Sequence, residues 1–111
     1  MVLSSPPSSF YRKKVKINPN PAGHWRVGKI ILDSNTKTAA WDCPNCAIVV
    51  MFPTARTPLL NKATEVVGQG SAVAQLDSNA KGYYPYCIMV QDADGDFHLV
   101  EGNSPPEMII E

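Results

Sequence analysis

Apolar and polar residues alternate along most of this chain, with the period of two that is typical of β-strands with one buried face. Residues 12–17 place Val15 and Ile17 on one face and lysines on the other. Residues 82–91 alternate most clearly, in two sets: Tyr84, Tyr86, Ile88 and Val90 on one face, and Tyr83, Cys87 and Met89 on the other. Residues 47–52 are instead continuously apolar, which predicts a strand that is covered on both faces.

Turn residues divide the rest of the chain into short segments. Gly28 indicates a bulge inside one predicted strand, and Pro85, which has no N–H, indicates an edge position or a bulge in another. Asp94-Gly95 predicts a tight hairpin, and residues 54–71 are irregular, with a short helical turn expected near 59–64. The remaining strands are predicted at 24–32, 36–41, 72–76, 97–101 and 107–111. Seven or eight strands in about 100 residues predict an all-β fold, namely an antiparallel Greek-key β-sandwich.

The composition fits one small domain. The chain has 111 residues, and its 10 prolines and 7 glycines act mainly as breaks between the predicted strands. Residues 1–10 are rich in Ser and Pro and predict a flexible N-terminal tail, which leaves 11–111 as a single β-sandwich domain. No apolar segment follows a basic one near the start, so a cytoplasmic location is expected if Met1 is the native start.

The charge balance argues against two classes of partner. Lys+Arg and Asp+Glu are 10 each, and this balance disfavours a general binder of nucleic acid or of acidic membranes. The charges are nevertheless unevenly placed, because residues 1–30 contain no acid whereas residues 77–111 are acidic apart from Lys81. A basic arm could recruit an acidic partner. Neutralisation of the two ends across adjacent strands is the favoured interpretation.

Three cysteines, Cys43, Cys46 and Cys87, are too few for a disulfide framework. Cys43-Pro-Asn-Cys46 has thioredoxin spacing, but a predicted strand follows it in place of the helix that activates the first thiol. The same pair has zinc-knuckle spacing, which Cys87 with His24 or His98 could complete. The favoured interpretation is that the three cysteines are small buried or half-buried apolar residues.

Other motifs do not predict catalysis. Residues 92–96 resemble part of an EF-hand loop, but the glycine is fourth and not sixth, which indicates a hairpin tip. No nucleophile–base pair and no glycine-rich phosphate loop has recognisable spacing, so no enzyme is expected. Six aromatic residues could form a stacking surface for a ligand, although core packing is favoured for Trp25, Trp41, Phe52, Tyr84, Tyr86 and Phe97.

The order of elements over residues 13–111 resembles the cupredoxins, the small β-sandwich blue-copper proteins. Trp41, a short loop and AIVVMFP (47–53) are similar to the cupredoxin strand that follows the first histidine ligand. Residues 82–87 resemble the Gly-x-Tyr-x-Tyr-Cys run that leads into the ligand loop. Residues 104–111 are similar to the closing strand of copper-free bacterial relatives.

The resemblance implies where copper ligands would stand, and the residues differ there. Asn45 or Cys46 replaces the first histidine, while Cys87 matches the thiolate. The next histidine, His98, comes eleven residues later and not within a few residues. Met89 and Met108 are the axial candidates, and neither has the right spacing. A copper-free protein without a standard type 1 copper site is therefore expected.

The same resemblance places Cys43, Cys46 and Cys87 at one end of the sandwich. Three thiols there could bind a soft ion such as Cu(I), or two of them could form a disulfide. The alternative function is therefore a soft-metal-binding or thiol redox protein that uses this cluster with copper or zinc, with His98 as a further ligand.

The favoured function is a non-enzymatic binding or assembly module without a cofactor. Its partner would be a protein or a small molecule, and the contact residues expected are Trp25, Tyr83 and Tyr84. Edge strands at 12–17 and 107–111 could also pair across a homodimer.

Overall fold

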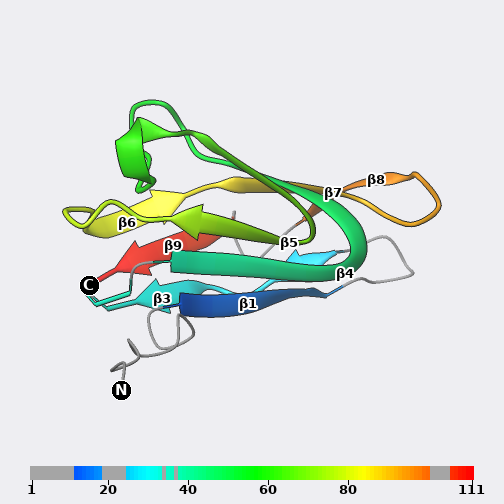
Figure 1. The fold of residues 1–111 in the computed structure, drawn as a ribbon, viewed down its shortest axis with the longest axis horizontal. Helices are drawn as coiled ribbons and strands as arrows, with labels where there is room; N and C mark the ends of the chain where they lie inside the picture. The colour runs from blue at the N-terminus through cyan, green and yellow to red at the C-terminus, as the bar shows by residue number, and fades with distance from the viewer. Residues whose placement is uncertain (1–11, 19–24, 34, 37, 101–105) are drawn as a thin grey trace, which may run out of the picture.

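The computed structural model describes residues 12–18, 25–33, 35–36, 38–100 and 106–111, and the strands among them form two sheets (Figure 1). The larger sheet has the order β2-β1-β4-β7-β8, with β5 also paired to β4, and the smaller one has the order β3-β9-β6. The strands are β1 Arg12–Asn18, β2 Arg26–Val27, β3 Ile30–Leu32, β4 Thr38–Met51, β5 Glu65–Gln75, β6 Gly82–Pro85, β7 Cys87–Gln91, β8 Phe97–Val100 and β9 Glu107–Ile110, with one 3-10 turn, η2, at Leu60–Lys62. Within these ranges no helix is both long enough and apolar enough to span a membrane. The predicted tail, residues 1–10, lies outside the described residues.

The all-β prediction is confirmed, but the strand pairing differs from that of an antiparallel sandwich. β1 runs parallel to β4, and β3 runs parallel to β9. Between β1 and β4 the chain passes through both sheets, by way of β2 and β3, before it returns to the first. Alternation along a strand fixes which face is buried, and it carries no information on the direction of the neighbouring strand.

Two segments that were predicted as single strands change sheets part of the way along. Residues 24–32 contain β2 of the larger sheet and β3 of the smaller one, separated at Gly28 and Lys29. Residues 82–91 contain β6 and β7, which separate at Tyr86. Pro85 has no N–H to donate to a ladder, and the Tyr86 N–H donates to the Pro106 carbonyl at 3.0 Å. The expected bulges at Gly28 and Pro85 are therefore the crossings between sheets.

β4 turns a corner in the middle, which Figure 1 shows as a wide arc. Its first part pairs with β1 and with residues 71–75 of β5, while its second part pairs with β7 and with residues 65–69. The register jumps between Asp42 and Ala47, so that residues 43–46 of β4 lie opposite Gly70 alone. Asn45 has a left-handed backbone, with φ of 65°, inside this bulge. The predicted strands 36–41 and 47–52 are thus two halves of one strand.

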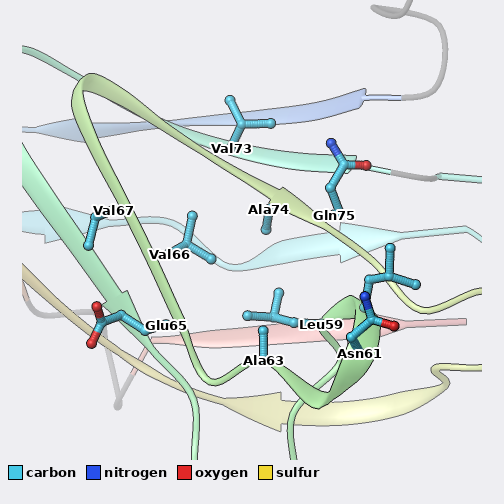
Figure 2. Close-up of a pocket in the computed structure, with 10 residues that line it drawn as sticks. Leu59, Asn61, Ala63, Glu65, Val66, Val67, Val73, Ala74 and Gln75 are labelled. Carbon is cyan, nitrogen blue, oxygen red and sulfur yellow. The ribbon is translucent and has the colours of Figure 1, made fainter.

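β5 folds with β4 at the same corner. A Cβ on Gly68 would overlap the Ser71 carbonyl oxygen and lie 2.9 Å from the Cα of Ala72, and Gly70 has φ of +76°. Gly68 therefore has no room for a side chain, and the positive φ of Gly70 favours glycine there. We call residues 65–69 and 71–75 the two limbs of β5; they diverge from this apex in Figure 2.

The fold brings the two ends of the β4–β5 ribbon together. Leu59, which follows β4, forms an isolated antiparallel bridge with Leu76, which follows β5. The Asp77 N–H also donates to the Pro58 carbonyl at 2.9 Å. The ribbon is therefore closed on itself at its two ends.

The core lies between the two sheets and is dominated by aromatic and branched side chains. Trp41 is fully buried, donates through Nε1 to the Tyr86 hydroxyl at 3.1 Å, and meets that ring edge to face. Burial raises the pKa of Tyr86 to about 12.

Phe97 is 67% exposed, so the prediction of core packing is wrong for this residue. The aromatic residues for which it is confirmed are Trp25, Trp41, Phe52, Tyr84 and Tyr86.

The edges of the larger sheet approach one another. Trp25, immediately before β2, stacks on His98 of β8 with ring centroids 4.6 Å apart. β2 and β8 are at opposite ends of the sheet order, so this contact curls the sheet toward a barrel. β1 lies between β2 and β4, and β9 lies between β3 and β6. The expectation of an edge strand is therefore wrong for residues 107–110, whereas β2 pairs with β1 only at Ile17 and Asn18 and leaves residues 12–16 paired, among the described strands, with β4 alone.

Two ion pairs join the basic beginning of the chain to acidic residues on neighbouring strands. Lys14 Nζ lies 2.8 Å from the Asp42 carboxylate, across the β1–β4 pair. Lys29 Nζ lies 3.0 Å from the Glu107 carboxylate at the start of β9. The favoured interpretation, neutralisation between the two ends of the chain, is confirmed for Lys29 and Glu107, whereas Lys14 pairs with Asp42, which belongs to neither end.

Candidate binding cleft

The structure joins two of the three cysteines and places the third elsewhere. Cys43 and Cys46 form a disulfide across the β4 bulge, with Cα atoms 5.5 Å apart, and both are buried. Cys87 is free and exposed. The β4–β7 ladder pairs Ala47 with Gln91 and Met51 with Cys87, so Cys87 lies at the ladder end away from the disulfide. Four strand positions span about 13 Å.

His98, the further ligand considered for a metal, takes part in the β7–β8 hairpin. Its Nε2 is hydrogen-bonded to the Asp92 carboxylate at 2.7 Å, and its ring stacks on Trp25. The other carboxylate oxygen of Asp92 accepts the N–H groups of Asp94 and Asp96. The His98 hydrogen bond, helped by those two, lowers the pKa of Asp92. The predicted Asp94-Gly95 hairpin is confirmed, with Gly95 at φ of 89°.

Across the described ranges no group of three or more His, Cys, Asp or Glu is arranged to hold a metal ion. His24, the other histidine considered, lies outside those ranges. Of the three expected contact residues, Trp25 and Tyr84 are buried and Tyr83 is half-exposed. A hydrogen bond from Tyr83 and the ion pair with Lys29 lower the pKa of Glu107, while the same carboxylate raises the pKa of Tyr83. Tyr83, Glu107 and Lys29 are therefore already paired with one another at the surface.

A cleft of about 390 Å³ that could receive a ligand lies between the two limbs of β5 (Figure 2). Its floor is apolar and consists of buried side chains from three segments, namely Leu59, Val66 and Ala74. The rim combines exposed apolar residues with three polar ones; it consists of Leu60, Ala63, Val67, Val73, Asn61, Glu65 and Gln75. Its volume is within the range of sites that bind small molecules or single side chains.

The third side of the cleft is the segment between β4 and β5, which short hydrogen bonds hold in place. The Thr57 hydroxyl donates to the Ala63 carbonyl and accepts the Leu59 N–H at 3.2 Å. The Phe52 N–H donates to the Thr64 carbonyl at 2.8 Å. Leu59 is thereby fixed beneath the opening, as Figure 2 shows. The cleft is therefore preformed and does not depend on a mobile loop.

Both limbs of β5 turn a backbone edge toward the cleft. Among the described strands β5 pairs only with β4, and β4 lies outside the angle that the limbs make (Figures 1 and 2). A strand edge offers N–H donors and carbonyl acceptors to an added chain. Glu65 is the one titratable side chain among the ten that line the cleft. Such a site can hold an extended apolar chain.

The cleft does not follow from the expectation that residues 54–71 are irregular. The structure extends β5 back to Glu65, and the even-numbered positions Val66, Ala72, Ala74 and Leu76 are all buried. This period-two pattern runs through Gly68 and Gly70 without interruption, and it is the signal in the sequence that could have revealed the strand.

Comparison of the chain with protein-family models, with curated proteins and with solved structures finds no match in any of the three. The resemblance to the cupredoxins therefore stays a prediction.

Proposed function

We propose that this protein is a non-enzymatic binding module that holds an extended apolar peptide segment of a partner protein in the cleft of β5. The observation that carries the proposal is the combination of an apolar floor with strand edges that pair with no other described strand. The partner backbone would pair along one limb, and one apolar side chain would enter above Leu59, Val66 and Ala74. In β-strand addition, backbone hydrogen bonds provide affinity and such a pocket provides specificity.

The proposed scaffold remains a copper-free, cupredoxin-like Greek-key sandwich. Two sheets around one core support this proposal, while the parallel pairs β1–β4 and β3–β9 are where a purely antiparallel version departs from the structure. The disulfide adds a second support, because it occupies two of the thiols that a soft metal ion would need.

An end-blocked hexapeptide that alternates valine and threonine is a suitable probe. We expect it to bind the wild-type protein, and we expect Ala63→Arg to weaken binding by about tenfold or more, because an arginine at the rim fills the opening. Ala63 is exposed, so the substitution leaves the core intact. The measurement is an NMR titration that follows the amide signals of Leu59, Val66 and Ala74.

Two controls make this experiment specific. Ala55→Arg adds the same side chain at an exposed position that does not line the cleft, and it should leave the affinity unchanged. The same hexapeptide with methylated central amide nitrogens keeps its side chains but loses backbone donors, and it should bind more weakly. Equal binding of the two peptides, or no effect of Ala63→Arg, would contradict strand addition in the cleft.

A further inference from the structure

One half of the larger sheet has an outer face that is almost free of charge. This half consists of residues 65–69 of β5, residues 47–51 of β4, and the strands β7 and β8. Their registers align Val67, Val49, Met89 and Leu99 in one row across four adjacent strands. Val67 is 62% exposed and Leu99 is 61% exposed. The apolar face, as we call it, consists of this row together with Ala47, Met51, Cys87 and Phe97.

Polar residues occur only at the margins of the apolar face. Gln69 and Gln91 lie in the row that contains Ala47 and Phe97, and Glu65 pairs with Met51 at one corner. Glu65 is thus the one charged residue among the outward-facing positions of these four strands. A charge-free sheet face of this size is unusual on a soluble monomer and is typical of an interaction surface.

The other half of the same sheet provides an internal comparison. Its outer face contains Lys14 and Lys16 of β1 and Asp42 of β4, with Lys14 and Asp42 paired at 2.8 Å. Ser71 and Gln75 of β5 face the same way. The strands β4 and β5 run through both halves. The difference in charge between the two outer faces therefore comes from the side chains and not from the backbone fold. The charged half is suited to water, and the apolar face is suited to contact with protein.

We infer that two copies of this chain pack together through the apolar face. Apart from Glu65 at one corner, an identical face carries no charge that opposes the first, so a two-fold arrangement can bring the apolar rows together with this carboxylate at the rim. Four strands spaced 4.8 Å apart and five residues long cover about 20 by 17 Å. With side-chain relief this corresponds to roughly 500–600 Å² per copy, near the lower limit for specific interfaces. The dimer is therefore expected to be weak, with a dissociation constant on the order of tens of micromolar.

Sedimentation equilibrium of the full chain tests the inference directly. Between about 1 µM and about 1 mM, a range that brackets this dissociation constant, the average mass should rise from 12.1 kDa toward twice that value. Leu99→Lys should raise the dissociation constant at least about tenfold, because it introduces a charge that dimerisation would bury. Phe97→Lys is a second variant at a 67% exposed position and should act in the same direction.

The matched control is Ile31→Lys, which introduces the same charge at a 49% exposed position of β3 in the other sheet. It should dimerise like the wild type, and so should Ala63→Arg, which blocks the cleft and leaves the apolar face unchanged. A wild-type protein that remains monomeric at about 1 mM would overturn the inference. Dimerisation of both lysine variants on the apolar face with wild-type affinity would do the same.

Discussion

Replacing Gly68 by valine should lower the free energy of unfolding by about 3 kcal/mol or more, because any Cβ at this position overlaps backbone atoms. The overlapping atoms are the Ser71 carbonyl group and the Cα of Ala72, which belong to the second limb of β5. The limbs must separate to make room, and the Leu59–Leu76 bridge would then be lost. Urea denaturation at neutral pH, followed by circular dichroism, measures the change.

Gly28→Val is the control for the Gly68 variant. Gly28 is exposed, and a Cβ there meets nothing within 4 Å. The substitution should change stability by less than about 1 kcal/mol. Comparable losses at the two positions would mean that valine acts through general backbone effects and not through the close approach at the apex of β5.

Replacing Trp41 by alanine should be equally severe, with a loss of about 3–5 kcal/mol. Trp41 is fully buried at the centre of the core and contacts Tyr86 through both its ring and its Nε1. Such a loss is a large part of the total stability of a small domain, so part of the protein should be unfolded at 25 °C. Thermal unfolding followed by circular dichroism gives the measurement.

The hydrogen bond between Trp41 and Tyr86 is tested by Trp41→Phe. It retains an aromatic ring but removes the donor to the Tyr86 hydroxyl, which should cost about 1–3 kcal/mol. Tyr86→Phe in the Trp41→Phe background removes the unsatisfied hydroxyl and should recover part of this loss. If the two substitutions are simply additive, the hydrogen bond has no separate role in the core.

Much of the local structure could be predicted from the sequence. The alternation in residues 82–91 predicts the buried set that includes Ile88 and Val90 and the exposed set that includes Cys87 and Met89. Asp94-Gly95 predicts the β7–β8 hairpin, because a glycine accepts the positive φ that this turn requires. These features depend only on residues that are close together in the chain.

The bulge in β4 and the fold in β5, which form the cleft, depend on contacts between residues far apart in the chain. Local sequence patterns could therefore not predict them. Residues 43–46 look like a loop between two strands, but tertiary pairing with β5 makes them a bulge within β4. Gly68 and Gly70 look like loop glycines, but they mark the apex of a folded strand. In the same way, no local signal places Trp25 on His98 across the sheet. Cys87 shares the β4–β7 ladder, but its register separates it from the disulfide.

The folded β4–β5 ribbon underlies both the cleft and the apolar face, and one NMR measurement tests it most directly. We expect nuclear Overhauser effects between the backbone protons of Leu59 and Leu76, because these residues form an antiparallel bridge. In a straight ribbon they would lie at opposite ends of about ten strand positions, roughly 30 Å apart. Observation of this contact would confirm that the ribbon closes on itself. Its absence, with the Val49–Val67 and Ala40–Val73 contacts of the hairpin still present, would contradict the folded ribbon and the cleft that it forms.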